Sequence, residues 1–198
     1  MPTWVSWTSS DVGGSGLGTY DVARSVDGGA LTTIATYLTN PWQDANLTTG
    51  HTYRFEVRTR DNAGNLGPWK LGATVRPGIT QQASTAVKYT GTWSTATGSG
   101  YLGGSVKYAT AAGASASYAF TGRSIAYITT RASGRGTARI YIDGVLAATL
   151  NLQASTVAYR YVAFLKTWTT LAKHTIKVVV AGTAGHPRVD IDAFAALQ

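Results

Sequence analysis

Glycine, asparagine, aspartate and proline divide this chain into short stretches in which apolar and polar residues alternate. A period of two places successive side chains on opposite faces of a β-strand. No stretch long enough for a helix repeats apolar residues with the helical period of about 3.6. Short alternating stretches with turn residues between them are typical of antiparallel sandwiches, so the sequence predicts an all-β fold.

In the first part of the chain, the alternation is clearest after His51. Tyr53, Phe55 and Val57 share one face of that predicted strand, while the other face carries Arg54, Glu56, Arg58 and Arg60. We expect the first face in the core and the second in water. The Asp27-Gly28-Gly29 stretch predicts a tight hairpin turn whose flanking strands pair antiparallel. Strands are predicted near Thr3–Thr8, Leu17–Val26, Leu31–Tyr37, His51–Asp61 and Trp69–Val75.

Proline and glycine cluster around Pro77, which predicts a domain boundary there, with a first domain over 1–77 and a second over 78–198. The first part has equal numbers of basic and acidic residues, and the second carries the whole net charge of +8. Such a local positive field attracts anionic partners or serves solubility. Strands are predicted near Ala86–Tyr89, Gly104–Tyr108, Ala114–Phe120, Ser124–Thr129, Gly136–Asp143, Val145–Leu150, Ala158–Leu165, His174–Val180 and Arg188–Leu197.

Several function classes are excluded by what the sequence lacks. There is no cysteine, and Glu56 is the only glutamate, so thiol chemistry and a glutamate pair for glycoside hydrolysis are absent. No nucleophile elbow, phosphate loop or dinucleotide motif occurs. We therefore expect no enzyme and no cofactor. No apolar run approaches the ~20 residues of a membrane helix, and Met1 leads into a predicted strand without an export signal.

The first part resembles a fibronectin type III domain over residues 3–76. That resemblance implies that Trp7 and Leu47 lie in a sandwich core and that Tyr53 forms a corner tying a loop to its strand. The family's first strand has no counterpart before Thr3, so we expect either a fragment of a longer protein or an edge completed by a neighbouring subunit. The matching residues are Trp7, Leu47, Gly50, Tyr53, Phe55, Val57 and Asp61-Asn62-Ala63-Gly64-Asn65.

The second part resembles the jelly-roll carbohydrate-binding modules, of galactose-binding-like type, that accompany fibronectin type III domains in secreted bacterial proteins. This implies a core that includes Phe120 and Phe194, and a place outside the cell or on its surface. The matching residues are Trp93, Tyr101-Leu-Gly103-Gly104-Ser105, Gly113, Phe120-Thr-Gly122, Gly136, Asp143-Gly144, Lys173-His174-Thr175 and Asp190-Ile-Asp192-Ala-Phe194.

Three aromatic residues of the second part are candidates for stacking on the apolar C–H face of a sugar ring. Trp93 and Tyr101 lie in a stretch rich in glycine, serine and threonine, where Trp93 could equally close the core. Trp168 follows an apolar strand and could be a platform or a lid on the core, and we favour the lid.

Arg131 and Arg135 flank a predicted Ser-Gly turn and could together grip carboxylate, sulfate or phosphate, because guanidinium pairs with such groups in bidentate fashion. Arg123, Arg139 and Arg160 could join them if the fold brings them together; scattered arginines would be solvated surface. Nucleic acid ranks below glycan as a partner, because no helix or ribbon that reads bases is recognisable.

His174 shares its strand parity with Ile176 and Val178 and is expected to point inward as a core histidine. No histidine pair has metal-type spacing. Asp190 and Asp192 lie on one strand face and could offer two carboxylates to a structural calcium ion. Pairing with the surplus arginines is the simpler account, so no metal site is expected.

Two functions from different classes remain. The preferred one is a non-catalytic region that binds a glycan or anionic envelope polymer through the second domain, with the first domain as spacer. The alternative is a structural subunit of an extracellular filament, surface layer or virion, assembled by strand addition between copies. A small hydrolase ranks last, because the sequence offers neither an acid pair nor a nucleophile with its base.

Overall fold

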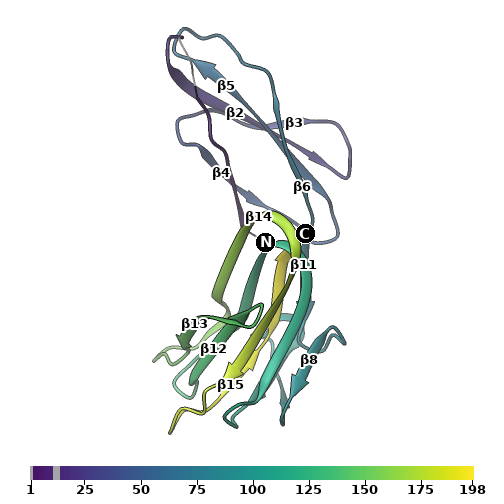
Figure 1. The fold of residues 1–198 in the computed structure, drawn as a ribbon, viewed down its shortest axis with the longest axis vertical. Helices are drawn as coiled ribbons and strands as arrows, with labels where there is room; N and C mark the ends of the chain where they lie inside the picture. Colours follow the sequence, from purple (N-terminus) through teal and green to yellow (C-terminus); the bar gives the residue numbers. More distant parts are fainter. Residues whose placement is uncertain (1, 11–13) are drawn as a thin grey trace. The chain divides into compact units, whose positions relative to one another are not determined.

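The computed structural model describes residues 2–10 and 14–198, and the chain consists mainly of antiparallel β-strands (Figure 1). The predicted all-β sandwich architecture is confirmed. Over the described residues the one helical element is a 3-10 turn at Leu102–Gly104. The chain separates into two compact units, Met1–Pro77 and Gly78–Gln198.

The first unit contains two antiparallel sheets. The smaller sheet pairs β1 (Pro2–Ser6) with β4 (Trp42–Asn46). Polar residues dominate β4, where Ala45 alone is buried, and its weak alternation explains why no strand is predicted there. The larger sheet has the order β3–β2–β5–β6, with bounds Thr32–Leu38, Leu17–Val26, Tyr53–Asp61 and Lys70–Val75.

The apolar faces of these sheets form the core of the first unit. Leu47, Tyr53 and Phe55 are buried. The hydroxyl of Tyr53 accepts a hydrogen bond from the Thr48 amide at 3.0 Å and donates one to the Thr48 carbonyl at 3.3 Å, which ties the loop before β5 to that strand. Trp7 packs edge-on against Tyr20, with ring centroids 5.4 Å apart.

The outer face of β5 is less exposed to solvent than the sequence predicts. Glu56 is buried, and its carboxylate accepts a hydrogen bond from Arg54 at 3.2 Å. Arg58 and Arg60 are each about three-quarters buried as side chains. The long aliphatic part of an arginine side chain can lie flat on a sheet and cover the residues beneath it. Alternation alone therefore overestimated the solvent exposure of this face.

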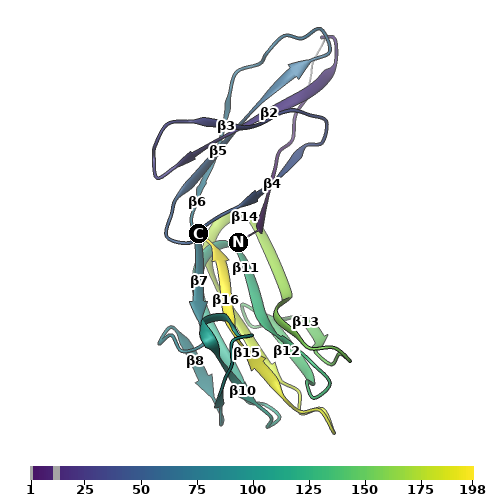
Figure 2. The same cartoon turned by 180° about the vertical axis from the view of Figure 1, so that it is seen from behind.

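The second unit contains a large sheet of order β13–β12–β14–β11–β16–β7, with β8 paired to β11, and a small sheet of order β15–β10–β9. Figure 2 shows β7, β16 and β15 on the near side of this unit. The strand bounds are Pro77–Gln81 (β7), Val87–Thr90 (β8), Ser94–Thr97 (β9), Ser105–Ala109 (β10), Ser115–Arg131 (β11), Thr137–Ile142 (β12), Val145–Asn151 (β13), Ala158–Val180 (β14), Val189–Ile191 (β15) and Ala193–Leu197 (β16).

The long β11–β14 ribbon folds back on itself. At one point Arg123 of β11 stands opposite the whole segment 168–171 of β14, a large irregularity in the ladder. Residues 132–136 then connect the end of β11 to β12, and these few residues reach at most about 20 Å. Because β12 pairs with the half of β14 that lies beside the start of β11, the ribbon must bend, as Figure 1 shows.

This bend places the two halves of each long strand in different layers. One layer joins β13, β12 and β8 to the ribbon half that includes Ser115–Gly122, and the other joins β16 and β7 to the half that includes Ser124–Arg131. The sequence predicts four strands where the structure has these two. Gly122 and the polar segment around Thr169–Thr170 interrupt the alternation without ending either strand.

The core of the second unit lies between these layers. Tyr127, Ile140, Ile176 and Phe194 are fully buried, and Phe120 is 6% exposed. The rings of Phe120 and Phe194 both stack on Tyr118, with centroids 5.8 and 5.5 Å away. The tyrosine hydroxyl of Tyr127 donates to the Asp190 carbonyl inside the core, and burial raises its pKa. This packing determines where the loops of the unit lie.

Candidate functional site

The two tryptophans that could be sugar platforms or lids on the core, Trp93 and Trp168, are both half-buried. Trp93 donates from its indole nitrogen to the Thr90 carbonyl at 3.1 Å and leans on Tyr89, with ring centroids 5.0 Å apart. Trp168 lies in the irregular segment of β14 and stacks on His174 at 3.9 Å, packed against the edge of the core. One face of the Trp168 ring is therefore covered by His174, and the Trp93 indole is held against β8.

Two other predicted ligand residues are engaged within the protein. Tyr101 is 8% exposed, so its face cannot receive a sugar. The guanidinium of Arg135 is bound to Asp190 at 2.7 Å and is largely covered. The sequence could not show this, because Arg135 and Asp190 are far apart along the chain and meet only through the parallel bridge between Arg135 and Arg188.

The two aspartates weighed as calcium ligands bind protein groups instead, and Asp190 pairs with arginines as the simpler account predicts. Asp190 is fully buried between Arg135 and Arg188, at 2.7 and 2.6 Å. Asp192 is also buried and accepts the Leu102 amide at 3.0 Å, while burial raises the pKa of its carboxyl. Over the described ranges, no group of three or more histidine, cysteine or acidic residues is placed to hold a metal ion.

His174 points into the edge of the core with a side chain 11% exposed, and its Nδ1 lies 2.7 Å from Asp143. The same carboxylate accepts the Thr175 amide at 2.7 Å. These bonds hold the pKa of Asp143 below its usual value, although partial desolvation opposes them. Asp143 has a positive φ of 50° in the turn before β13, so the pair fixes a hairpin.

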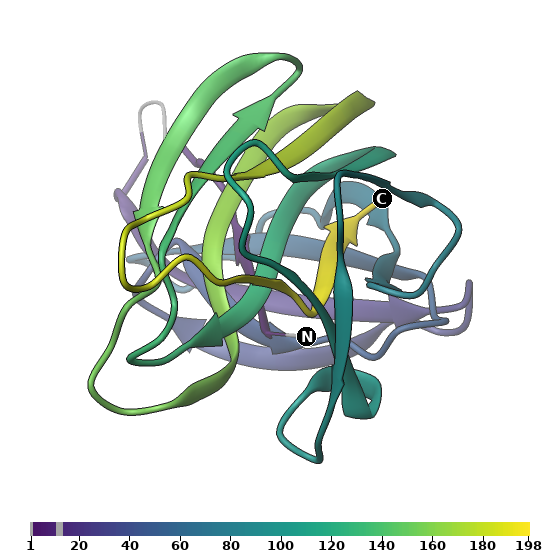
Figure 3. The same cartoon turned by 90° about the horizontal axis from the view of Figure 1, so that it is seen from below.

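Exposed aromatic rings occur instead at the start of β14, at the end of the unit opposite the bend. Tyr159 is 49% exposed and Tyr161 is 39% exposed. We call these two residues, with Arg131, Arg160 and the segment 99–101, the tyrosine surface. Figure 3 looks onto the loops at this end of the unit. The sequence signal that could have found it is two tyrosines alternating with an arginine in a strand.

The position of Tyr159 is set by close packing against glycine. A Cβ on Gly100 would come within 2.6 Å of the Tyr159 ring, so this contact requires glycine. The Tyr159 ring also meets Tyr101 edge-on, at a centroid distance of 5.3 Å. Arg160 has a φ of 52° and donates to the carbonyls of Ser99 and Gly100 at 3.0 Å. The strand and the loop are thereby locked together.

Arg131 lies at the other side of this surface. Its guanidinium stands over the Tyr161 ring at 5.1 Å and donates to the Gln153 carbonyl at 3.1 Å. Among the described residues no carboxylate lies within ion-pair distance of Arg131 or Arg160. The surface therefore combines ring faces with hydrogen-bond donors and positive charge, although the charge of Arg160 interacts with the Asp192 carboxylate. Of the other arginines, Arg123 bonds the Thr169 carbonyl and Arg139 is exposed on β12.

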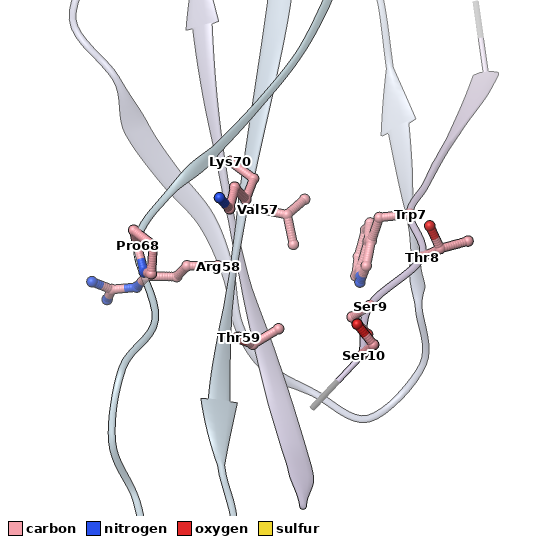
Figure 4. Close-up of a pocket in the computed structure, with 9 residues that line it drawn as sticks. All are labelled: Trp7, Thr8, Ser9, Ser10, Val57, Arg58, Thr59, Pro68 and Lys70. Carbon is pink, nitrogen blue, oxygen red and sulfur yellow. The ribbon is translucent and has the colours of Figure 1, made fainter. Parts of the chain in front are cut away.

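A gap of about 490 Å³ opens between the sheets of the first unit. In Figure 4, Val57 and Thr59 point toward Trp7 across this gap, while Arg58 points away from it. The indole nitrogen of Trp7 is buried without a hydrogen-bond partner. Trp7 and Val57 are half-buried, unlike the other residues predicted in this core, because the gap leaves one side of each uncovered.

Comparison with known proteins finds partial relatives. No protein-family model matches the sequence. The chain is 30% identical over 106 residues to the A type blood N-acetyl-alpha-D-galactosamine deacetylase of Flavonifractor plautii, which covers 54% of this chain and 13% of that protein. It is 33% identical over 110 residues to the A type blood alpha-D-galactosamine galactosaminidase of the same organism, covering 56% and 10%. It is 43% identical over 63 residues to exoglucanase B of Cellulomonas fimi, covering 31% and 5%.

The chain thus spans at most 13% of the length of these curated relatives. Among solved structures, a family two carbohydrate esterase from Cellvibrio japonicus matches with a TM-score of 0.46 and 12% identity, over 62% of this chain and 34% of the esterase. A CBM36-1 domain of a multidomain xylanase from the hindgut metagenome of Trinervitermes trinervoides matches with a TM-score of 0.43 and 17% identity, over 62% and 97%. The described residues include no helix long and apolar enough to span a membrane.

Proposed function

We propose that this chain is a non-catalytic, glycan-binding region of a larger extracellular carbohydrate-active protein, and that the tyrosine surface of the second unit holds the glycan. The exposed rings of Tyr159 and Tyr161 carry this proposal. An aromatic ring binds the apolar face of a sugar, and adjacent donors bind its hydroxyls. Arg131 supplies such donors directly beside Tyr161.

The relatives support the same proposal. Their names describe enzymes that act on blood-group galactosamine or on glucan, and this chain matches a small share of each. Short matches to several large carbohydrate enzymes of different reaction types fit an accessory module better than a catalytic one. Such substrates lie outside cells, which favours an extracellular location.

The first unit enters this proposal as a spacer of fibronectin type III type. The buried positions of Leu47 and Phe55, together with the Tyr53 corner, support that resemblance. The second unit enters as a jelly roll of carbohydrate-binding type, supported by its folded-over β11–β14 ribbon. The division between the units at Pro77 and Gly78 supports treating them as separate modules.

Replacing Tyr159 and Tyr161 together by alanine should weaken glycan binding roughly thirtyfold, because each ring contributes about 1 kcal/mol of stacking. Isothermal titration calorimetry would measure this with an oligosaccharide ending in N-acetyl-α-D-galactosamine, with cello-oligosaccharides and with polygalacturonate. The control is Leu165→Ala, which removes an exposed apolar side chain from the same half of β14. Equal binding by the double variant and the control would place the glycan site elsewhere.

The gap beside Trp7 favours a second candidate, a structural subunit that receives a strand from a neighbouring copy. β1 and β4 form a two-stranded sheet in the first unit, where Trp7 lines the gap, and strand addition between copies joins such small sheets in assemblies. If this candidate holds, the mass measured by light scattering should rise with protein concentration, and Trp7 fluorescence should shift as the gap fills. A mass that stays monomeric would leave the accessory module as the function.

A further inference from the structure

We propose that the first unit, beyond any role as a spacer, carries a second binding surface for acidic polysaccharide on the outer face of its larger sheet. The surface consists of Tyr37, Arg60, Asp21, Arg58 and Trp69, which we call the arginine ladder. It lies in a different unit from the tyrosine surface and stands on separate observations.

Asp21 lies beneath the arginine ladder and binds both of its arginines. Its carboxylate is 1% exposed and accepts a hydrogen bond from Arg58 Nε at 2.9 Å. Arg60 lies 3.8 Å from the same oxygen, and the other carboxylate oxygen accepts the Tyr37 amide at 3.3 Å. One buried acid on β2 therefore orients two arginines of the neighbouring strand β5.

Each arginine also stacks on an aromatic ring. Arg58 lies over Trp69 at 4.6 Å, and Arg60 lies over Tyr37 at 4.7 Å. The two guanidinium groups are thus fixed before any ligand arrives. Binding to fixed groups avoids the entropy cost of ordering long side chains, so the ladder is preorganised for recognition.

The charge that faces solvent is positive although acids are present. Asp21 is almost fully covered, and the Glu56 side chain is 10% exposed beneath Arg54. Arg54, by contrast, is 42% exposed, and Tyr37 is 64% exposed. Three arginines stand over two carboxylates on this face, which leaves a net charge of +1 and presents guanidinium N–H groups and ring faces outward.

These features match an acidic polysaccharide. Arg58 and Arg60 are partly engaged, by Asp21 and, for Arg60, by the Gly64 carbonyl at 3.3 Å, so only their solvent-facing N–H groups and those of Arg54 are offered to a ligand. Carboxylate or sulfate groups bind these N–H groups, and sugar C–H faces pack on the exposed ring of Tyr37. The ladder crosses β3, β2 and β5 and ends at Trp69, directly before β6, a width of about 14 Å at the usual strand spacing. That width exceeds one sugar ring, so a polymer chain fits it better than a monosaccharide does.

The test uses the full chain carrying Tyr37→Asn and Arg60→Gln. Asparagine suits position 37, where φ is 55°, and Asp21 keeps its bond to Arg58 in this variant. Arg139→Gln is the control, since it removes an exposed positive charge from the second unit. A further variant, Arg58→Lys, keeps the charge beside Asp21 but loses the planar stacking group. Thermal unfolding verifies that each variant folds.

Calorimetry with polygalacturonate, its fully methyl-esterified form and heparin measures binding. We expect at least one of the two acidic polymers to bind about tenfold more tightly than the neutral ester, and the one that does identifies carboxylate or sulfate as the preferred group. The double variant should weaken that binding about tenfold and Arg58→Lys about threefold, whereas Arg139→Gln should change it less than twofold.

The proposal is overturned if neither acidic polymer binds better than the ester, or if the double variant binds like Arg139→Gln. Loss of acidic-polymer binding in the Tyr159→Ala, Tyr161→Ala variant alone would place that ligand on the second unit, and would refute the ladder while supporting the proposed function. Loss in the ladder variants alone would support the ladder, and the tyrosine surface would then be tested by the calorimetry with the neutral oligosaccharides.

Discussion

Replacing Gly136 by alanine should destabilise the second unit by about 3 kcal/mol, because the new methyl group has no space. A Cβ at this position would lie 2.0 Å from the carbonyl oxygen of His186. That neighbour is backbone, so it cannot swing aside as a side chain would. The Gly136 amide also donates to the Arg188 carbonyl at 2.9 Å, which holds the two segments together.

The matched control is Gly134→Ala, two residues earlier in the same turn. A Cβ on Gly134 meets no atom within 4 Å, so this change should leave the free energy of unfolding within about 0.5 kcal/mol of the wild type. Urea denaturation followed by tryptophan fluorescence measures both variants. If the Gly136→Ala and Gly134→Ala variants prove equally stable, the close approach of Gly136 to the segment 186–188 is wrong. The placement of Arg135 beside Asp190, which depends on that approach, would then be wrong as well.

Replacing Asp190 by alanine should destabilise the second unit by about 3 to 5 kcal/mol. The change would leave Arg135 and Arg188 without their shared carboxylate while both remain largely buried, and an uncompensated buried charge is costly. Asp190→Asn, which keeps the shape but loses the charge, should give an intermediate loss.

Asp44→Ala is a suitable control, because Asp44 is exposed and its loss should change stability by less than about 0.5 kcal/mol. Urea denaturation at low and high salt adds a second measurement, since buried pairs are screened little by salt. A loss below about 1 kcal/mol for Asp190→Ala, or a loss that high salt abolishes, would show that the pair is solvated.

Much of the fold follows from local pattern. Alternation in Tyr53, Phe55 and Val57 correctly placed a strand, because burial on one face of a sheet demands a period of two. The bend of β11 could not be predicted from the alternation of apolar and polar residues. Gly122 resembles the end of a strand, and only the pairing with β14 on both sides of it shows that the strand continues. The strand β4 was missed because its single buried side chain leaves almost no periodic signal.

The residues of the candidate site were harder to predict from the sequence than the strands. Residue type suggested Trp93, Tyr101 and Arg135 as ligand groups, but exposure decides which rings and charges can meet a ligand. Tyr101 is covered by the ring of Tyr159, which takes the exposed position. The arginine ladder was not predicted either, because its members come from three strands and the residue before a fourth, and share no sequence motif.

The amino-acid sequence by itself determined that this protein is built of β-strands, where most of them run and that the excess positive charge lies after Pro77. Those properties depend on near neighbours along the chain. Tertiary structure alone decided that Asp190 neutralises Arg135, that Asp21 gathers Arg58 and Arg60, and that Tyr159 and Tyr161 face solvent. Ion pairing and exposure depend on distances between strands remote in sequence, and these distances arise only when the layers pack.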